Sequence, residues 1–192
     1  MLLNILRQFN WVDIFVIIIL IRTCYIATKN GFAVELFKIS GTILAIYLSF
    51  HYYSNLADVI KQRFIGEKIP LEFLDFLCFG FLAILGYIIL VLFRQTFSRF
   101  IKMEAVPQLD KWGGFFIGLI RGILLSSLVI FALLISSFAY FRNSANDAYL
   151  GGRIFKIAPA TYGKIWFSFA SKFMPQEKFN LTIQEVGQDL TK

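Results

Sequence analysis

The residues of this chain best suited to chemistry are ionisable side chains set inside apolar sequence. Arg121 interrupts the fourth and longest apolar run, Asp13 and Arg22 interrupt the first, and Asp75 lies in the third. Within a membrane such groups pair with one another or line a path for ions and solutes. Glu35 and Lys38 are spaced to pair at the rim of a helix. The charges therefore indicate either buried ion pairs or a transport pathway.

Catalytic patterns are missing from the sequence. It contains no nucleophile beside a base, no metal-ligand spacing and no phosphate-binding loop. His51 is the single histidine, and we interpret it as an interfacial side chain rather than a metal or proton site. Cys24 and Cys78 both lie in apolar segments and are expected to be free buried thiols. We expect no enzyme, no cofactor and no metal.

Composition predicts a membrane protein. Of the 192 residues, 58% are hydrophobic and only 16% are charged, whereas about 25% are charged in an average soluble domain. The net charge of +7 comes from basic residues that flank or punctuate the apolar runs. This arrangement favours anionic lipid head groups as partners over nucleic acid.

The apolar runs predict an all-α, polytopic membrane protein. The transmembrane domain is expected over residues 1–141, with helices at about 11–28, 33–53, 71–93 and 112–141. Asn30 and Gly31 favour a tight turn between the first two helices. Residues 142–175 form an amphipathic region in which Trp166 is expected at the membrane interface, although its apolar face could pack on the bundle instead. Residues 176–192 are predicted to be a polar mobile tail.

The fourth run is too long for the bilayer if it is one helix. Thirty residues of helix extend about 45 Å, against a hydrocarbon core of about 30 Å. We favour residues 122–141 as the core segment, with Arg121 at head-group level and Trp112 as an interfacial anchor. The alternative centres the helix in the bilayer, and Arg121 then needs an acidic or carbonyl partner.

Small residues recur every four positions in two of the predicted helices and indicate close helix packing. One such series is Gly114, Gly118, Gly122 and Ser126, and the other includes Gly41 and Ala45.

Arg22 lies within the bilayer if the first helix spans it. Snorkelling toward the Thr28 end explains it most simply, and a bundle-facing ion pair or pathway role is the alternative. The positive-inside rule is nearly balanced, with a lean toward loops 29–32 and 94–111 being cytoplasmic.

Two stretches resemble one family. Trp11-Val12-Asp13, followed by Lys29-Asn30-Gly31-Phe32 and Glu35, is similar to the opening of the colicin V production (CvpA-type) proteins of bacteria. Leu109-Asp110-Lys111, followed by Gly114 and Gly118-Leu119-Ile120-Arg121-Gly122, resembles the fourth-helix segment of that family. The likeness covers roughly residues 10–160. Asn30 departs from it, because the family often has two basic residues at 29–30, and nothing past Pro175 matches.

The resemblance implies a multi-pass protein of the bacterial inner membrane, linked to colicin V production or export and to envelope homeostasis. It supplies no catalytic residues. We expect the protein to act by helix packing with itself or with a membrane protein partner. The alternative is an oligomeric small-solute transporter or channel component that uses Asp13, Arg22, Asp75 and Arg121.

Overall fold

Four long helices form the body of the protein in the computed structural model, which describes residues 10–65, 69–97, 107–174, 176–183 and 186. They are α2 (Trp11–Asn30), α3 (Phe32–Ile60), α4 (Leu71–Phe97) and α5 (Pro107–Ile135). All four are long and apolar enough to cross a membrane. The described residues contain no strand. The fold is therefore the predicted all-α class with four membrane-spanning helices.

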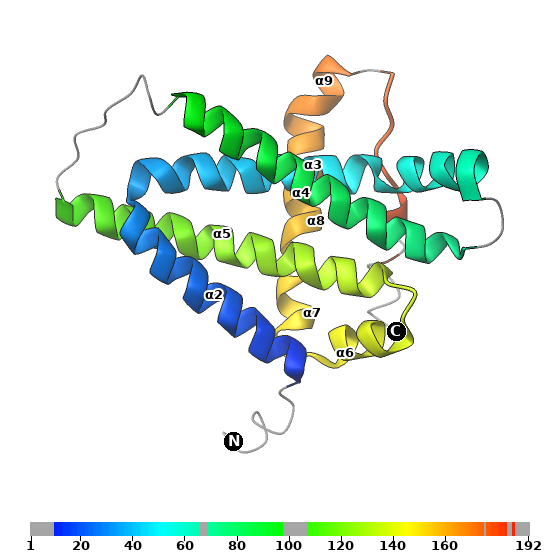
Figure 1. Ribbon diagram of the computed structural model, residues 1–192, viewed down its shortest axis with the longest axis horizontal. Helices are drawn as coiled ribbons and strands as arrows, with labels where there is room; N and C mark the ends of the chain where they lie inside the picture. The colour runs from blue at the N-terminus through cyan, green and yellow to red at the C-terminus, as the bar shows by residue number, and fades with distance from the viewer. Residues whose placement is uncertain (1–9, 66–68, 98–106, 175, 184–185, 187–192) are drawn as a thin grey trace.

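The turn between α2 and α3 is as short as the sequence predicts. Gly31 alone separates the two helices and has φ of +80°, a conformation that costs glycine least. Its N–H donates to the carbonyl oxygen of Ala27, which closes the last turn of α2. The two helices consequently leave this turn in different directions (Figure 1).

The ends of α3 and α5 differ from the prediction. α3 continues past residue 53 to Ile60 and into a π-helical turn, η1 (Lys61–Ile65), because Tyr53 and Ala57 are buried against the core. α5 starts at Pro107, where the missing N–H of proline is tolerated. It ends at Ile135, although the apolar sequence continues, and the Oγ of Ser136 then accepts the Phe138 N–H at 3.3 Å. A new helix, α6 (Ala139–Asp147), follows.

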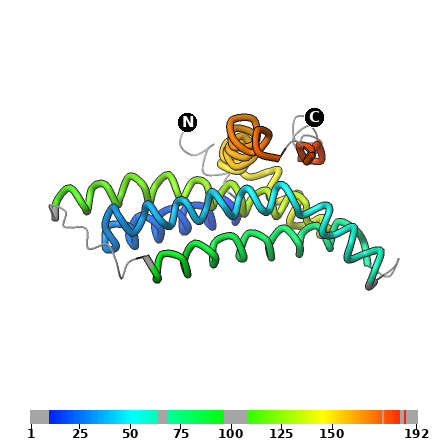
Figure 2. The backbone as a smooth tube through the Cα atoms, turned by 90° about the horizontal axis from the view of Figure 1, so that it is seen from above, coloured from blue at the N-terminus to red at the C-terminus, as the bar shows by residue number. Residues whose placement is uncertain are grey.

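The long helices pack side by side, and the C-terminal helices cross them (Figures 1 and 2). α3 lies antiparallel to α4, and α5 lies beside both α2 and α3. The crossing helices are α7 (Gly151–Ile154), α8 (Ile157–Ile165), η3 (Trp166–Ala170) and α9 (Ser171–Phe173). Figure 2 shows them nearly end-on, on the face of the bundle opposite α4.

Aromatic rings hold the crossing helix to the bundle. The Phe50 ring of α3 contacts Phe131 of α5, with centroids 4.5 Å apart, and Phe79 of α4 at 5.2 Å. Tyr162 of α8 stacks on the same Phe50 ring at 5.9 Å. All four side chains are fully buried. This core joins one residue from each of four helices.

The C-terminal region therefore differs from the predicted interfacial helix. Trp166 is only 5% exposed and packs on the bundle, because its indole stacks on the His51 ring. The opposite side of the region exposes Phe167, Phe169 and Phe173. The apolar residues of the segment thus divide between the bundle and the outer surface, where Lys164, Ser168 and Lys172 are also exposed.

Part of the predicted mobile tail also packs on the bundle. Ile183 is buried in the core and Phe179 packs beside it. The Asn180 side-chain amide donates to the carbonyl oxygen of Phe50 at 2.8 Å and to the hydroxyl of Ser54 at 3.1 Å. A polar composition did not indicate these contacts, because they depend on a few apolar and amide side chains. Residues 184–185 and 187–192 of the predicted tail lie outside the described residues.

Candidate functional site: buried polar contacts between the helices

A charged cluster is buried where α3 begins. The Glu35 side chain is fully buried, and its Oε1 accepts hydrogen bonds from the Lys38 ammonium at 2.9 Å and the Asn30 amide at 2.8 Å. Its Oε2 lies 2.9 Å from Nη2 of Arg121, which is 6% exposed. Glu35 thus receives two cations and an amide. The pairing offsets part of the cost of burying these charges.

This cluster gives Arg121 the acidic partner that a buried arginine needs. The segment 122–141 is not one helix, since α5 ends at Ile135, and Arg121 lies at the middle of α5 with its charge inside the protein. Glu35 lies in the first turn of α3, so the pair is about 4.5 Å along α3 from its start. The ion pair is therefore near the beginning of α3, although it is central in α5.

Asp110 holds the α2–α3 turn against α5. Its Oδ1 accepts the Phe32 N–H at 2.7 Å, which satisfies one donor at the open start of α3. The carboxylate occupies the space where a side chain at Gly31 would project. Glycine at position 31 therefore provides both the positive φ of the turn and the space that the Asp110 carboxylate occupies.

The glycine series of α5 faces α2 of the same chain. A Cβ built on Gly114 would lie 2.6 Å from the carbonyl oxygen of Ala27, and one on Gly118 would overlap the Ala27 methyl group. A Cβ on Gly122 would lie 3.1 Å from Leu20. Ser126, which continues the series, is fully buried. The ladder therefore allows close approach of two helices within one molecule.

The small residues of α3 have the same use. A Cβ on Gly41 would lie 3.4 Å from Leu90 of α4, and one on Gly86 would lie 2.7 Å from the Cα of Ala45. Both predicted stripes are consequently occupied inside the bundle.

Asp13 connects the start of α2 to the chain after α6. Its carboxylate accepts the N–H of Leu150 at 2.7 Å and of Tyr149 at 3.1 Å, and also that of Asn10 at 3.0 Å. The Asn10 amide donates to the Ser144 carbonyl oxygen at 2.8 Å. Asp13 is fully buried. It therefore holds a turn and does not line an open path.

Two predicted residues point away from the bundle. Arg22 is exposed on the outer surface of α2, which fits snorkelling and contradicts a bundle-facing ion pair. Trp112 is 65% exposed and packs only along its own helix, edge-on to Phe115 and tilted on Phe116. Its position stays compatible with a membrane-interface anchor.

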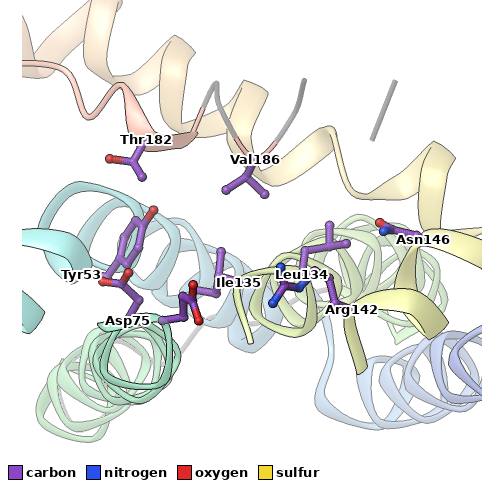
Figure 3. A pocket seen from close by; sticks show the side chains of 9 residues that line it. Tyr53, Asp75, Leu134, Ile135, Arg142, Asn146, Thr182 and Val186 are labelled. Carbon is purple, nitrogen blue, oxygen red and sulfur yellow. The ribbon is translucent and has the colours of Figure 1, made fainter. Parts of the chain in front are cut away.

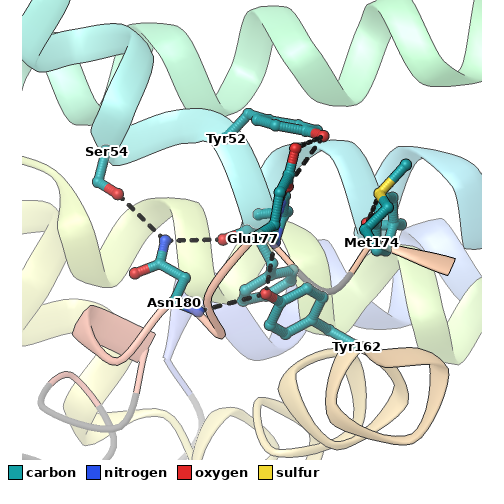
Figure 4. A network of polar contacts seen from close by, with 9 residues as sticks. Tyr52, Ser54, Tyr162, Met174, Glu177 and Asn180 are labelled. Atoms are coloured by element: carbon teal, nitrogen blue, oxygen red, sulfur yellow. Dashed lines mark hydrogen bonds and ion pairs between the residues drawn. The ribbon is translucent and has the colours of Figure 1, made fainter. Parts of the chain in front are cut away.

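His51 is the centre of a network that the sequence did not indicate (Figure 4). The ring is 4% exposed, its Nδ1 lies 2.9 Å from the Tyr162 hydroxyl, and its Nε2 meets the Glu177 carboxylate. The ring also stacks on Tyr47, with centroids 5.3 Å apart. Its partners come from α8 and from the segment after α9, so His51 is buried inside the protein by the C-terminal region. Nothing near His51 in the sequence signals these partners.

Tyr162 is the second centre of this network. Burial raises the pKa of Tyr162 to about 12, so its hydroxyl is protonated at neutral pH. The same oxygen accepts the Asn180 N–H at 3.4 Å and lies within hydrogen-bond distance of Nδ1 of His51. The other ring nitrogen of the histidine, Nε2, is hydrogen-bonded to Glu177. The chain of bonds fastens residues 177–180 to α3.

Asp75 belongs to neither cluster. It lines a separate cavity at the beginning of α4 together with Glu72. No group of three potential metal ligands occurs among the described residues.

Comparison with known proteins places this arrangement in a family. The family model of the colicin V production protein matches residues 12–155, which span α2 through α7 and contain the Asp13, Glu35 and Arg121 contacts. The chain belongs to the colicin V production protein family. A colicin V production protein homolog of Buchnera aphidicola is 32% identical over 142 residues, which cover 70% of this chain and 83% of the relative. No solved structure matches the chain.

The family match ends before α8. α8, Glu177 and Asn180 all lie after residue 155. The His51 network therefore joins the matched region to a C-terminal part outside it. A multi-pass membrane protein of this family is the identity that the chain itself supports.

Proposed function

We propose that this protein is an inner-membrane assembly protein. It supports colicin V production or export, and more broadly envelope homeostasis, by packing its outer helix faces against a membrane protein partner or a second copy. The observation that carries the proposal is how the membrane charges are used. Inside the bundle, Glu35 pairs with Arg121, and Asp13 accepts backbone N–H groups. Arg22 points outward. A transport pathway needs charged groups along an accessible passage, and these four residues do not form one. Asp75, the remaining candidate, lies apart from them and lines a separate cavity at the start of α4.

One surface available for assembly lies on α4. Since the glycine ladder of α5 is occupied by α2, a partner must use another face. The outer side of α4 exposes Phe81 (58%), Ile84 (62%) and Leu92 (57%). These residues and Ile88 recur at helical spacing and form a stripe that a partner helix or lipid can cover. Anionic lipid head groups would meet the basic residues that flank the helices.

Photocrosslinking in native membranes tests the assembly proposal. A photoreactive amino acid is placed at Phe81, Ile84 or Leu92, and at the buried Phe79 as a matched control on the same helix. We expect one discrete protein adduct from the outer positions and none from position 79. Lipid adducts alone at every outer position would contradict the proposal.

Toxin release from a strain that carries the colicin V determinants and lacks this protein separates assembly from transport. The double variant Glu35→Leu/Arg121→Leu removes both members of the ion pair, so the charge left without its carboxylate partner is that of Lys38, whose side chain is 15% exposed. Assembly predicts normal toxin release from this variant and reduced release from Ile84→Asp. If the double variant folds and assembles but releases no toxin, an oligomeric transporter or channel component becomes the better interpretation.

A further inference from the structure

A cavity of about 190 Å³ lies at one end of the bundle, away from the contacts described above. Side chains from α3, α4, α5, α6 and the C-terminal segment line it (Figure 3). Leu134 and Ile135, at the end of α5, form part of an apolar wall. Such a mixture of an apolar wall with a few polar groups is typical of small-molecule sites.

One end of the cavity is acidic. Asp75 and Glu72 are three residues apart on α4, so both carboxylates are on the same side of the helix. The Oδ1 atom of Asp75 is buried and has no hydrogen-bond partner among the described residues. An unsatisfied buried acceptor costs free energy that a donor in the cavity would recover. The Tyr53 ring lies beside Asp75 in Figure 3.

The other end carries a positive charge. Arg142 and Asn146 are four residues apart on α6 and both line the cavity. Among the described residues, no ion pair joins Arg142 to Asp75 or Glu72. Figure 3 shows Asp75 and Tyr53 toward one side of the cavity, with Arg142 and Asn146 toward the other. The cavity thus presents separated charges of opposite sign that do not neutralise each other.

We propose that this cavity binds a small zwitterion. Its amine is held by Asp75 and Glu72, and its carboxylate or phosphate is held by Arg142 with help from the Asn146 amide. Both ends of such a ligand meet an opposite charge, whereas a simple cation or anion meets only one. A free aminophosphate or amino acid and the head group of phosphatidylethanolamine share this chemistry.

The position of the cavity makes both sources accessible. Its lining comes from the first turns of α4 and the last turn of α5, which are ends of membrane-spanning helices. Lipid head groups and dissolved solutes meet at that level of a membrane. The proposal does not depend on the assembly function. The first turns of α4 line the cavity, whereas the exposed stripe on the outer side of α4 forms the proposed assembly surface.

The test is binding to the purified full-length protein in detergent, by calorimetry. The probes are O-phosphoethanolamine, alanine, short-chain phosphatidylethanolamine and short-chain phosphatidylglycerol. Ethanolamine alone and inorganic phosphate alone serve as single-charge probes. We expect a zwitterionic probe to bind at least about ten-fold more tightly than either single-charge probe, since each lost charged hydrogen bond costs roughly a factor of ten. If only phosphatidylethanolamine binds, the ligand is a lipid head group. If only O-phosphoethanolamine or alanine binds, the ligand is a dissolved compound.

Variants connect binding to the cavity. Asp75→Asn and Arg142→Gln are each expected to weaken zwitterion binding by about ten-fold or more. Asp147→Asn, which changes a charge on α6 outside the cavity lining, should leave binding unchanged. Thermal melts establish that each variant is folded. If no zwitterion binds, or if Asp75→Asn binds as well as Asp147→Asn, the proposal is overturned.

Discussion

A close approach of two helices, between Gly118 of α5 and Ala27 of α2, makes a quantitative prediction. A Cβ added at Gly118 would lie closer than 3.0 Å to the Ala27 methyl carbon, whereas carbon atoms in contact are about 3.5–4.0 Å apart. Gly118→Ala therefore requires α2 and α5 to separate by at least about 0.5 Å. We expect this overpacking to reduce the free energy of unfolding by about 1–3 kcal/mol.

Two other glycines calibrate this effect. A Cβ at Gly122 would lie 3.1 Å from Cδ2 of Leu20, the flexible end of a side chain, so Gly122→Ala should cost less than Gly118→Ala. A Cβ at Gly80 of α4 would meet nothing within 4 Å. Gly80→Ala should therefore be neutral or stabilise the helix by up to about 1 kcal/mol.

The cause can be isolated with a compensating substitution. Ala27→Gly removes the methyl group that the new side chain would strike, so Ala27→Gly/Gly118→Ala should be more stable than the sum of its single variants predicts. The assay is unfolding of the purified protein by sodium dodecyl sulfate in mild detergent, followed by circular dichroism. Equal stabilities of Gly118→Ala and Gly80→Ala, or strict additivity in the double variant, would refute the packing argument.

Three further predictions concern the buried polar contacts. Arg121→Leu should lower the free energy of unfolding by about 3–5 kcal/mol, because it leaves the buried Glu35 carboxylate without its main cation, and Glu35→Leu/Arg121→Leu should recover most of that loss in the same detergent assay. Asp13→Leu removes the acceptor of three backbone N–H groups and should cost about 1–3 kcal/mol, visible as faster tryptic cleavage at Arg153 than in Asp13→Asn. Because the pKa of Tyr162 is raised to about 12 from an ordinary value of about 10, its contribution is complete below pH 10 and is lost as the pH rises toward 12, by up to about 2.7 kcal/mol. Tyr162→Phe should lack this alkaline loss, and an ultraviolet titration should show one late-ionising tyrosine fewer; an unchanged titration would contradict the assignment.

The helices were predictable where the sequence pattern and the packing agree. The apolar runs and the Asn30-Gly31 pair located four spanning helices and the first turn. The end of α5 was not predictable from hydropathy, because only Ser136 and Ser137 interrupt the apolar sequence before it resumes at 138–141. The extension of α3 to Ile60 likewise depends on the burial of Ala57, which is a tertiary contact.

The sequence indicated several residues of the candidate site but not the residues that they contact. Arg121 required a counter-charge if it was buried, and the sequence contained several acids that could supply one. Only the fold selects Glu35, because the single-glycine turn at Gly31 sets α3 beside the middle of α5. The same limit applies to the glycine ladder, whose spacing indicates close packing but does not specify α2 as the partner. His51 carried no signal, since its partners are 111 and 126 residues away.

The distance along the chain between His51 and Glu177 has a consequence for biosynthesis. Chains are synthesised at about 5–20 residues per second, so α3 waits on the order of ten seconds for the segment that completes its histidine contacts. Asp13 must likewise wait for the N–H groups of Tyr149 and Leu150. During that interval both helices carry polar groups that the finished bundle buries. The insertion machinery or lipid head groups must solvate these groups until residues made later complete the contacts of helices that were inserted earlier.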